Sequence, residues 1–210
     1  MSDHEVLIKQ LSRAAKPVKR TAAVWRRVLV WIALALPAGA LFSLLAQRAL
    51  TDWQQPGAFW AVIELLLTLC IGTLAVVRTF TLSIAGRKSL RWQIFIPLVA
   101  AWLLVNVISM SEGHQPLGNI GDGTPCYTFM MLAGTPMVLL MLTALRRTRT
   151  LHPVRTLLMA GVGIAFMALS LLALCHPVHG DFPDFVMHIA AIFTLIGATI
   201  LAGFRWVAVG

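Results

Sequence analysis

The sequence predicts an all-α, polytopic membrane protein, a bundle of six transmembrane helices with both termini in the cytoplasm. Hydrophobic residues make up 59% of the 210 residues and charged residues only 12%, whereas soluble domains contain about 45–50% and about 25%. The apolar residues form six runs, each close to the roughly 20 residues that a helix needs to cross a bilayer. The basic residues fall in alternate loops. Together these three observations define the class.

The N-terminal segment, residues 1–27, is basic and is predicted to lie in the cytoplasm. Apolar residues at helical spacing give it a stripe along one face of an amphipathic helix. The stripe consists of Leu7, Leu11, Ala14 and Val18. A basic amphipathic helix of this kind is suited either to lie on anionic lipid or to bind a partner protein, and the sequence leaves both roles open.

The transmembrane domain is predicted over residues 28–206. Its six spans cover about residues 28–46, 58–77, 92–110, 126–145, 156–174 and 184–204. Each span is expected to be helical, because backbone groups in lipid must be paired within their own segment. Two groups of small residues predict close packing of the last two spans. They are Ala160, Gly161, Gly163 and Ala165 in one span and Ala190, Thr194, Ala198 and Ala202 in the other.

The orientation follows from the basic residues, because positively charged loops stay in the cytoplasm. Every Lys and Arg except Arg48 falls in the N-terminal segment, in the second or fourth loop, or after the last span. The remaining loops carry acidic residues, among them Asp52 and Asp181. Both termini are therefore expected in the cytoplasm. The net charge of +9 is then a topology signal and does not indicate nucleic-acid binding.

A short polar hairpin between the fifth and sixth spans, residues 174–188, is rich in reactive side chains. It contains Cys175, His176, His179, Asp181, Asp184 and His188. The orientation places this hairpin outside the cytoplasm, together with Cys126 at the start of the fourth span. Asp184 and His188 are one helical turn apart, so they share one face of the sixth span.

Three interpretations of these residues stay open. An oxidising compartment permits a disulfide between Cys126 and Cys175. Alternatively, thiolate and imidazole groups suit a zinc-like or copper-like transition metal, with Asp184 and His188 as further sensing groups. The possible ligands are Cys126, Cys175, His176 and His179. In the third interpretation Asp184 only caps the sixth span, and the hairpin histidines are solvated loop residues.

Glu64 is an acidic residue inside the second span. A charge at membrane depth costs about 2.5 kcal/mol or more, so this carboxyl group needs water or a partner. It can pair with Asn106, bind a cation or carry a proton, and the simplest interpretation is a hydrated or protonated group near the interface. Together with the hairpin, Glu64 supports an alternative class for the chain, a small metal or proton transporter or a membrane enzyme.

The whole chain resembles the NrsF family of bacterial membrane anti-sigma factors. The matching features are the N-terminal VLIKQLSRAAKPVKR, the cysteine segments GTPCYTFMMLAGTP and LALCHPVHGDFPDFVMH, and the layout of six spans. The resemblance implies a non-enzymatic protein of the bacterial inner membrane, embedded in the lipid bilayer. It also implies that the protein holds an extracytoplasmic-function (ECF) sigma factor and releases it under oxidative or heavy-metal stress.

The resemblance also implies roles for particular residues. Cys126 and Cys175 are expected to sense the signal, and the N-terminal segment is expected to bind the sigma factor. No catalytic residue, no required cofactor and no direct contact with nucleic acid are expected, and the oligomeric state is not specified. Capture of the signal at the cysteines, with the hairpin histidines contributing, is expected to shift the last three spans and to loosen the hold on the sigma factor.

Overall fold

The computed structural model describes residues 3–14, 21–46, 51–113, 123–148, 150–176, 178 and 181–207. Within these ranges the chain forms α1 (Asp3–Ala14), α2 (Val24–Ser43), α3 (Ala58–Leu82), the 3-10 helix η1 (Trp92–Ile94), α4 (Phe95–Gly113), α5 (Thr124–Arg146), α6 (Pro153–Leu172) and α7 (Phe182–Val207). The six helices from α2 to α7 are long and apolar enough to cross a membrane. The predicted all-α class with six membrane-length helices is therefore confirmed.

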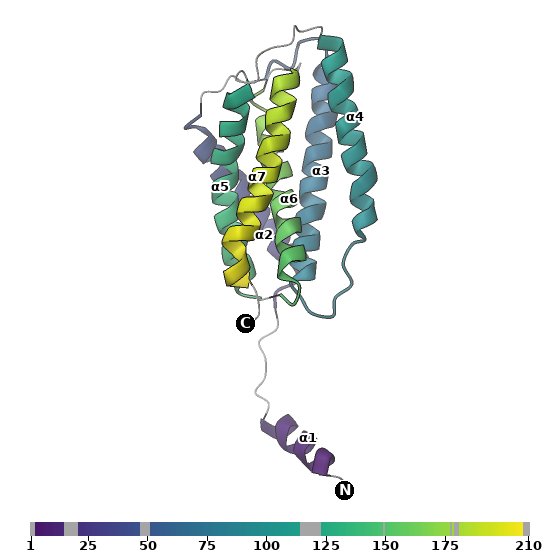
Figure 1. Cartoon of the computed structure of the whole chain (residues 1–210), viewed down its shortest axis with the longest axis vertical. Coiled ribbons are helices and arrows are strands. Elements are labelled where there is room, and N and C mark those ends of the chain that lie inside the picture. The colour runs from purple at the N-terminus through teal and green to yellow at the C-terminus, as the bar shows by residue number, and fades with distance from the viewer. Residues whose placement is uncertain are drawn as a thin grey trace.

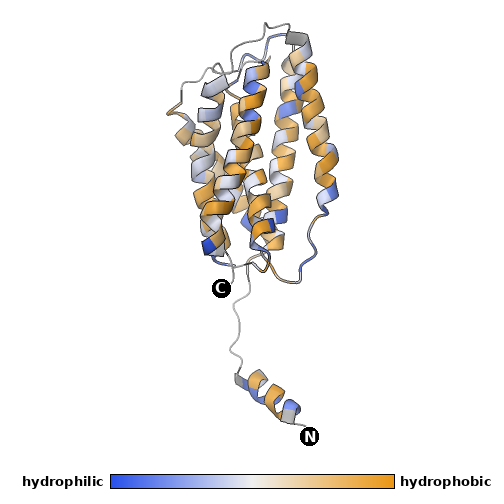
Figure 2. Cartoon of the chain, in the orientation of Figure 1, coloured by the Kyte–Doolittle hydropathy of each residue, from blue (hydrophilic) through white to orange (hydrophobic). Residues whose placement is uncertain are grey.

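The six long helices stand side by side in one bundle, and α1 lies apart from them (Figure 1). The start of α2 and the end of α7 lie at the same end of the bundle, which we call the terminal end. The ends of α2, α4 and α6 and the starts of α3, α5 and α7 lie at the opposite end, which we call the distal end. The six long helices are rich in apolar residues (Figure 2), and many of their large apolar side chains are exposed, as expected for helices in contact with lipid.

α6 is the central helix of the bundle. In the most apolar 18-residue stretch of α6, 67% of the residues are buried, compared with 28% in the corresponding stretches of α2, α3, α4 and α7. Glycines let its neighbours approach closely, because a Cβ added at Gly163 would lie 2.9 Å from Cγ2 of Val76 in α3, and one at Gly161 would lie 2.7 Å from Cα of Ile196 in α7. The predicted small-residue packing of this span is confirmed, since Ala160, Gly161, Gly163 and Ala165 are all buried.

The small-residue stripe predicted for the last span does not form the packed face of α7, so that prediction is wrong. Thr194, Ala198 and Ala202 are exposed. α7 packs through a larger side chain instead, because the small residue lies on its neighbour: a Cβ added at Gly134 of α5 would lie 2.6 Å from Cδ2 of Leu195. Leu195 is accordingly almost completely buried.

Arg27 ties the start of α2 to two other helices at the terminal end. Its guanidinium group donates hydrogen bonds to Oγ of Ser83, at 3.1 Å, and to Oγ1 of Thr148, at 3.2 Å. The same group lies 4.5 Å from the ring centroid of Phe80 in α3. The last residue of the N-terminal segment is therefore held by the ends of both α3 and α5. In the sequence this arginine is recognisable only as one of the topology charges.

Charged side chains are segregated between the two ends of the bundle. The described basic residues from α2 onwards all lie at the terminal end. They are Arg26, Arg27, Arg78, Arg87, Lys88, Arg91, Arg146, Arg147, Arg155 and Arg205. Asp52, Asp181 and Asp184 lie at the distal end, and Glu64 lies in the distal half of α3.

Candidate functional site

Four side chains predicted to sense the signal meet at the distal end, and we call them the polar cluster: Cys126, His176, Asp184 and His188. One ligand atom each of Cys126, His176 and His188 can be chosen so that all three lie within 4.8 Å of one another. The carboxylate of Asp184 joins them, because Oδ1 accepts a hydrogen bond from Sγ of Cys126 at 3.4 Å and Oδ2 lies 3.3 Å from Nε2 of His176.

Helix starts place two members of the polar cluster. Cys126 and Asp184 are each the third residue of their helices, α5 and α7, and both helices begin at the distal end. The positive ends of two helix dipoles therefore face the cluster, and this potential suits anionic groups such as carboxylate and thiolate. His188 follows Asp184 by one turn on the same face of α7, as the sequence spacing predicts.

Thr51 positions His176, which lies in the turn after α6. Oγ1 of Thr51 accepts a hydrogen bond from the backbone N–H of His176 at 3.1 Å. The same oxygen lies 3.0 Å from the carbonyl oxygen of Ala173 and 2.8 Å from that of His176, to which the hydroxyl can donate. The backbone N–H of Thr51 donates to the carbonyl of Leu174 at 3.3 Å. A residue between α2 and α3 thus holds the turn that presents His176.

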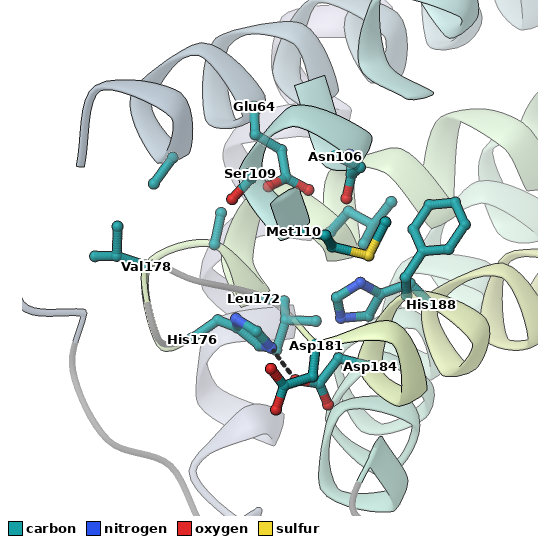
Figure 3. A pocket seen from close by; sticks show the side chains of 14 residues that line it. Glu64, Asn106, Ser109, Met110, Leu172, His176, Val178, Asp181, Asp184 and His188 are labelled. Atoms are coloured by element: carbon teal, nitrogen blue, oxygen red, sulfur yellow. Dashed lines mark ion pairs between the residues drawn. The ribbon is translucent and has the colours of Figure 1, made fainter. Parts of the chain in front are cut away.

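A cavity of about 40 Å³ lies beside the polar cluster, between α3, α4, α6 and α7. Glu64 and Asn106 approach it from the side opposite His176 and Asp184 (Figure 3). Ligand pockets for drug-sized molecules measure about 300–1,000 Å³, so this cavity has room for water or an ion and not for an organic ligand. Glu64 therefore faces the same small space as the hairpin, one of the arrangements that the sequence left open.

Three aromatic side chains pack together next to the cavity, and one of them, Phe185, lines it. Trp102 of α4 is almost completely buried. Its ring packs edge-on against Phe166 of α6, at a centroid distance of 5.3 Å, and also against Phe185 of α7, at 6.1 Å. Asn106, one turn further along α4, donates from Nδ2 to the carbonyl of Trp102 at 2.8 Å. Trp102 and Phe166 belong to the hydrophobic core, so Phe185 joins the wall of the cavity to that core.

His188 is the most deeply buried member of the polar cluster, with 7% of its surface exposed. Among the described residues, neither of its ring nitrogens has a hydrogen-bond partner, and its ring centroid lies 5.4 Å from that of His176. Oδ1 of Asp181, in the lining of the cavity, is also buried without a partner among these residues. An unpaired buried polar group costs about 1–3 kcal/mol, so these atoms indicate a site for water or an ion.

The remaining predicted site residues have different positions. Cys175 is half-buried against the hydrophobic core and is not a member of the group of close ligand atoms. His179 and Val18 lie outside the described residues, and Ala14 is the last residue of α1. Leu7 and Leu11 are on α1, with 53% and 62% of their surfaces exposed. The disulfide between Cys126 and Cys175 stays a prediction.

Some residues of the site were not singled out from the sequence. Thr51 has no distinguishing signal, since threonine is ordinary in a polar loop. Trp102 was part of an apolar run and carries no sign that it spans three helices. Asp181 was named among the reactive side chains of the hairpin but was given no role, although it lies only three positions before Asp184.

The fold and the site together define a class: a helical protein of membrane-spanning type, with a partly buried polar site at one end of the bundle and an exposed amphipathic helix beyond the other. The family model for NrsF, described as negative regulator of sigma F, matches residues 11–208. The chain therefore belongs to the NrsF family, which makes it a negative regulator of a sigma factor. No curated protein and no solved structure matches the chain.

Proposed function

We propose that the protein is an anti-sigma factor of the bacterial inner membrane. It holds an ECF sigma factor through its cytoplasmic N-terminal segment and releases it when a redox or heavy-metal signal reaches the distal end. The observation that carries this proposal is the family match over residues 11–208. It covers the whole bundle and the last residues of α1, so the proposed sensor and the part of the binding segment from Leu11 onward belong to the matched region, whereas Leu7 lies before it.

The exposed apolar face of α1 supports a role in partner binding. Leu7 and Leu11 lie one turn apart, and Val6 and Ile8 beside them are exposed as well. An amphipathic helix with such a face commonly binds by laying it into an apolar groove of a partner protein. Every described side chain of α1 is exposed, so the helix is available to a sigma factor without first leaving the bundle.

The segregation of charge supports the cytoplasmic placement of both termini. The described basic residues of the bundle lie at the terminal end, from which the N-terminal segment also extends. Positively charged loops are retained in the cytoplasm. The polar cluster at the distal end then faces the periplasm, where oxidants and metal ions reach it first.

A path for the signal runs along α5. At the distal end this helix carries Cys126, which contacts Asp184 of α7. Just beyond the last residue of α5, Thr148 accepts a hydrogen bond from Arg27. Arg27 is the last residue of the N-terminal segment and lies in the first turn of α2. A signal shifts such an equilibrium only as far as its affinities for the two states differ. A site shared between α5 and α7 allows the affinity for the signal to differ between the two states, because a change in the relative position of these helices alters the geometry of the site.

The test compares two neighbouring substitutions in α1. Leu11→Glu places a charge in the apolar stripe, whereas Ser12→Glu adds the same charge outside it, and both side chains are exposed. Burying a leucine is worth about 1.5–3 kcal/mol, so Leu11→Glu should weaken sigma-factor binding about ten- to hundredfold. Ser12→Glu should leave it close to the original. Full-length variants are purified from solubilised membranes, and bound proteins are identified by mass spectrometry.

Two results would contradict the proposal. One is recovery of no sigma factor with the original, folded protein. The other is equal recovery with Leu11→Glu and with Ser12→Glu, which would show that the stripe does not make the contact.

A further inference from the structure

We propose that the polar cluster is a binding site for a divalent transition metal of the zinc type. Its ligands are the thiolate of Cys126, the imidazoles of His176 and His188, and the carboxylate of Asp184. The inference rests on the proposed function only where it makes this metal the signal; the binding itself is independent of any sigma factor. The set differs from the one that the sequence indicated, because it contains one cysteine and not two.

The spacing of the ligand atoms is close to that of a tetrahedral metal site. Ligands held about 2.0–2.3 Å from zinc lie about 3.3–3.8 Å from one another. Asp184 already lies 3.4 Å from Cys126 and 3.3 Å from His176, and the selected atoms of Cys126, His176 and His188 lie within 4.8 Å. Side-chain rotations that shorten the separations among Cys126, His176 and His188 by about 1 Å would bring these three atoms to tetrahedral spacing. One carboxylate oxygen of Asp184 would then serve as the fourth ligand.

Burial of His188 is the second, independent observation that indicates a ligand. Its side chain is more than nine-tenths buried, and neither ring nitrogen has a hydrogen-bond partner among the described residues. A metal ion would bind the lone pair of one nitrogen and so remove the cost of leaving it unpaired. The adjoining cavity of about 40 Å³ gives space for the ion and for a water molecule.

The chemistry of the ligand set selects the class of metal. Thiolate and imidazole favour zinc and similar soft or borderline ions, whereas magnesium and calcium prefer sites made of oxygen atoms. Binding requires the thiolate of Cys126, so the thiol proton is released to solvent as the sulfur–metal bond forms. No electron is transferred. Cadmium, which is softer than zinc, fits the same set, and this makes the site suitable for sensing a toxic metal.

The position of the ligands connects metal binding to the helices. Cys126 lies on α5, His176 in the turn after α6, and Asp184 and His188 on α7. A bound ion would draw these elements together at the distal end. The same α5 ends beside the contact between Thr148 and Arg27, so closing the metal site acts on the helix that leads to the N-terminal segment.

The first experiment uses the full-length protein in detergent, stripped of metal and titrated with Co²⁺, whose bond to a thiolate gives a charge-transfer absorption band. One Co²⁺ per chain should bind, with this band, and Zn²⁺ should displace it. Cys126→Ser should abolish the band, and His188→Gln should weaken binding by about 100-fold or more, since even supporting residues of a metal site contribute about 10- to 100-fold. Cys175→Ser is the matched control and should leave the affinity within about twofold.

The second measurement needs no substitution and so does not depend on the variants folding. Zn²⁺ should protect Cys126 of the original protein from alkylation, as read by peptide mass spectrometry, and should leave the labelling of Cys175 unchanged. Absence of Co²⁺ binding, or unchanged binding in both Cys126→Ser and His188→Gln, would overturn the proposal. Protection of Cys175 together with loss of the band in Cys175→Ser would also overturn it, in favour of a site with two cysteines.

Failure of the metal site and failure of the proposed function are distinguishable. Metal binding is measured without a sigma factor, and sigma-factor recovery by the Leu11→Glu comparison is measured without added metal. If the protein binds Co²⁺ through Cys126 and retains its sigma factor at saturating Zn²⁺ or Cd²⁺, the metal site stands and its role as the release signal is refuted.

Discussion

A single hydroxyl group, that of Thr51, holds the turn that carries Cys175 and His176. It is buried and contacts the backbone of both Ala173 and His176. In this way a loop that contains none of the cluster residues controls where one of them lies. The geometry of the polar cluster thus depends on Thr51, which is not itself a member of the cluster.

Thr51→Val keeps the shape of the side chain and removes these hydrogen bonds. Because the backbone groups of the turn lose a buried partner, the free energy of unfolding should fall by about 1–3 kcal/mol. Thermal unfolding in detergent measures the loss. Thr73→Val is the control, since its exposed hydroxyl bonds only to Leu69 of its own helix. Equal stability of the two variants would show that the turn is held by other contacts.

The spacing of residues in the sequence predicted part of the polar cluster. Asp184 and His188 share a face because they are four residues apart on a helix. The approach of Cys126 to Asp184 was not predictable, because it depends on which helices are neighbours and on the rotation of α5 about its axis. The pairing of Cys126 with Cys175 stays a prediction.

Where α3 and α6 cross, each of the two helices has a glycine at the contact, so their backbones approach closely. A Cβ at Gly72 of α3 would lie 3.2 Å from the backbone nitrogen of Met167, and one at Gly163 of α6 would lie 3.2 Å from that of Val76. Backbone atoms cannot move aside as a flexible side chain can. The crossing therefore fixes the distance between the helix that carries Glu64 and the helix that leads to His176.

Gly163→Ala should push these two helices apart. Overpacking of a tight contact costs about 1–3 kcal/mol, so the unfolding temperature in detergent should fall. Gly197→Ala on α7 is the matched control, because an added Cβ there meets no atom within 4 Å, and alanine is the better helix former. A Gly163→Ala variant as stable as the control would mean that the crossing relaxes without cost.

The apolar runs predicted the existence of all six helices, and their ends were less predictable. α2 begins at Val24 and not near residue 28, because Val24 is buried in the bundle and Arg27 is anchored to α3 and α5. The sequence prediction began the span at residue 28, directly after the basic residues of the N-terminal segment. The packed face of α7 was also missed, since it depends on Gly134 of a different helix.

For the whole molecule, the segregation of charge leads to a test of topology. A phosphatase that is active only in the periplasm should be active when fused after Gly113, at the distal end of α4, and inactive when fused after Gly210. The reason is that the described basic residues of the bundle lie at the terminal end and are retained in the cytoplasm. Activity of the fusion at the C-terminus, with the fusion after Gly113 inactive, would reverse the proposed orientation.

The exposure of α1 has a consequence for how the family diverges. Leu7 and Leu11 are more than half exposed on a helix that lies apart from the bundle, so the bundle places no restraint on which residues occupy these positions. In the proposed function, only the surface of the sigma factor restrains which residues occupy these positions. The N-terminal segment is then free to change in step with its partner while α5, α6 and α7 are held by their mutual packing. Recognition and sensing can evolve separately within one short chain.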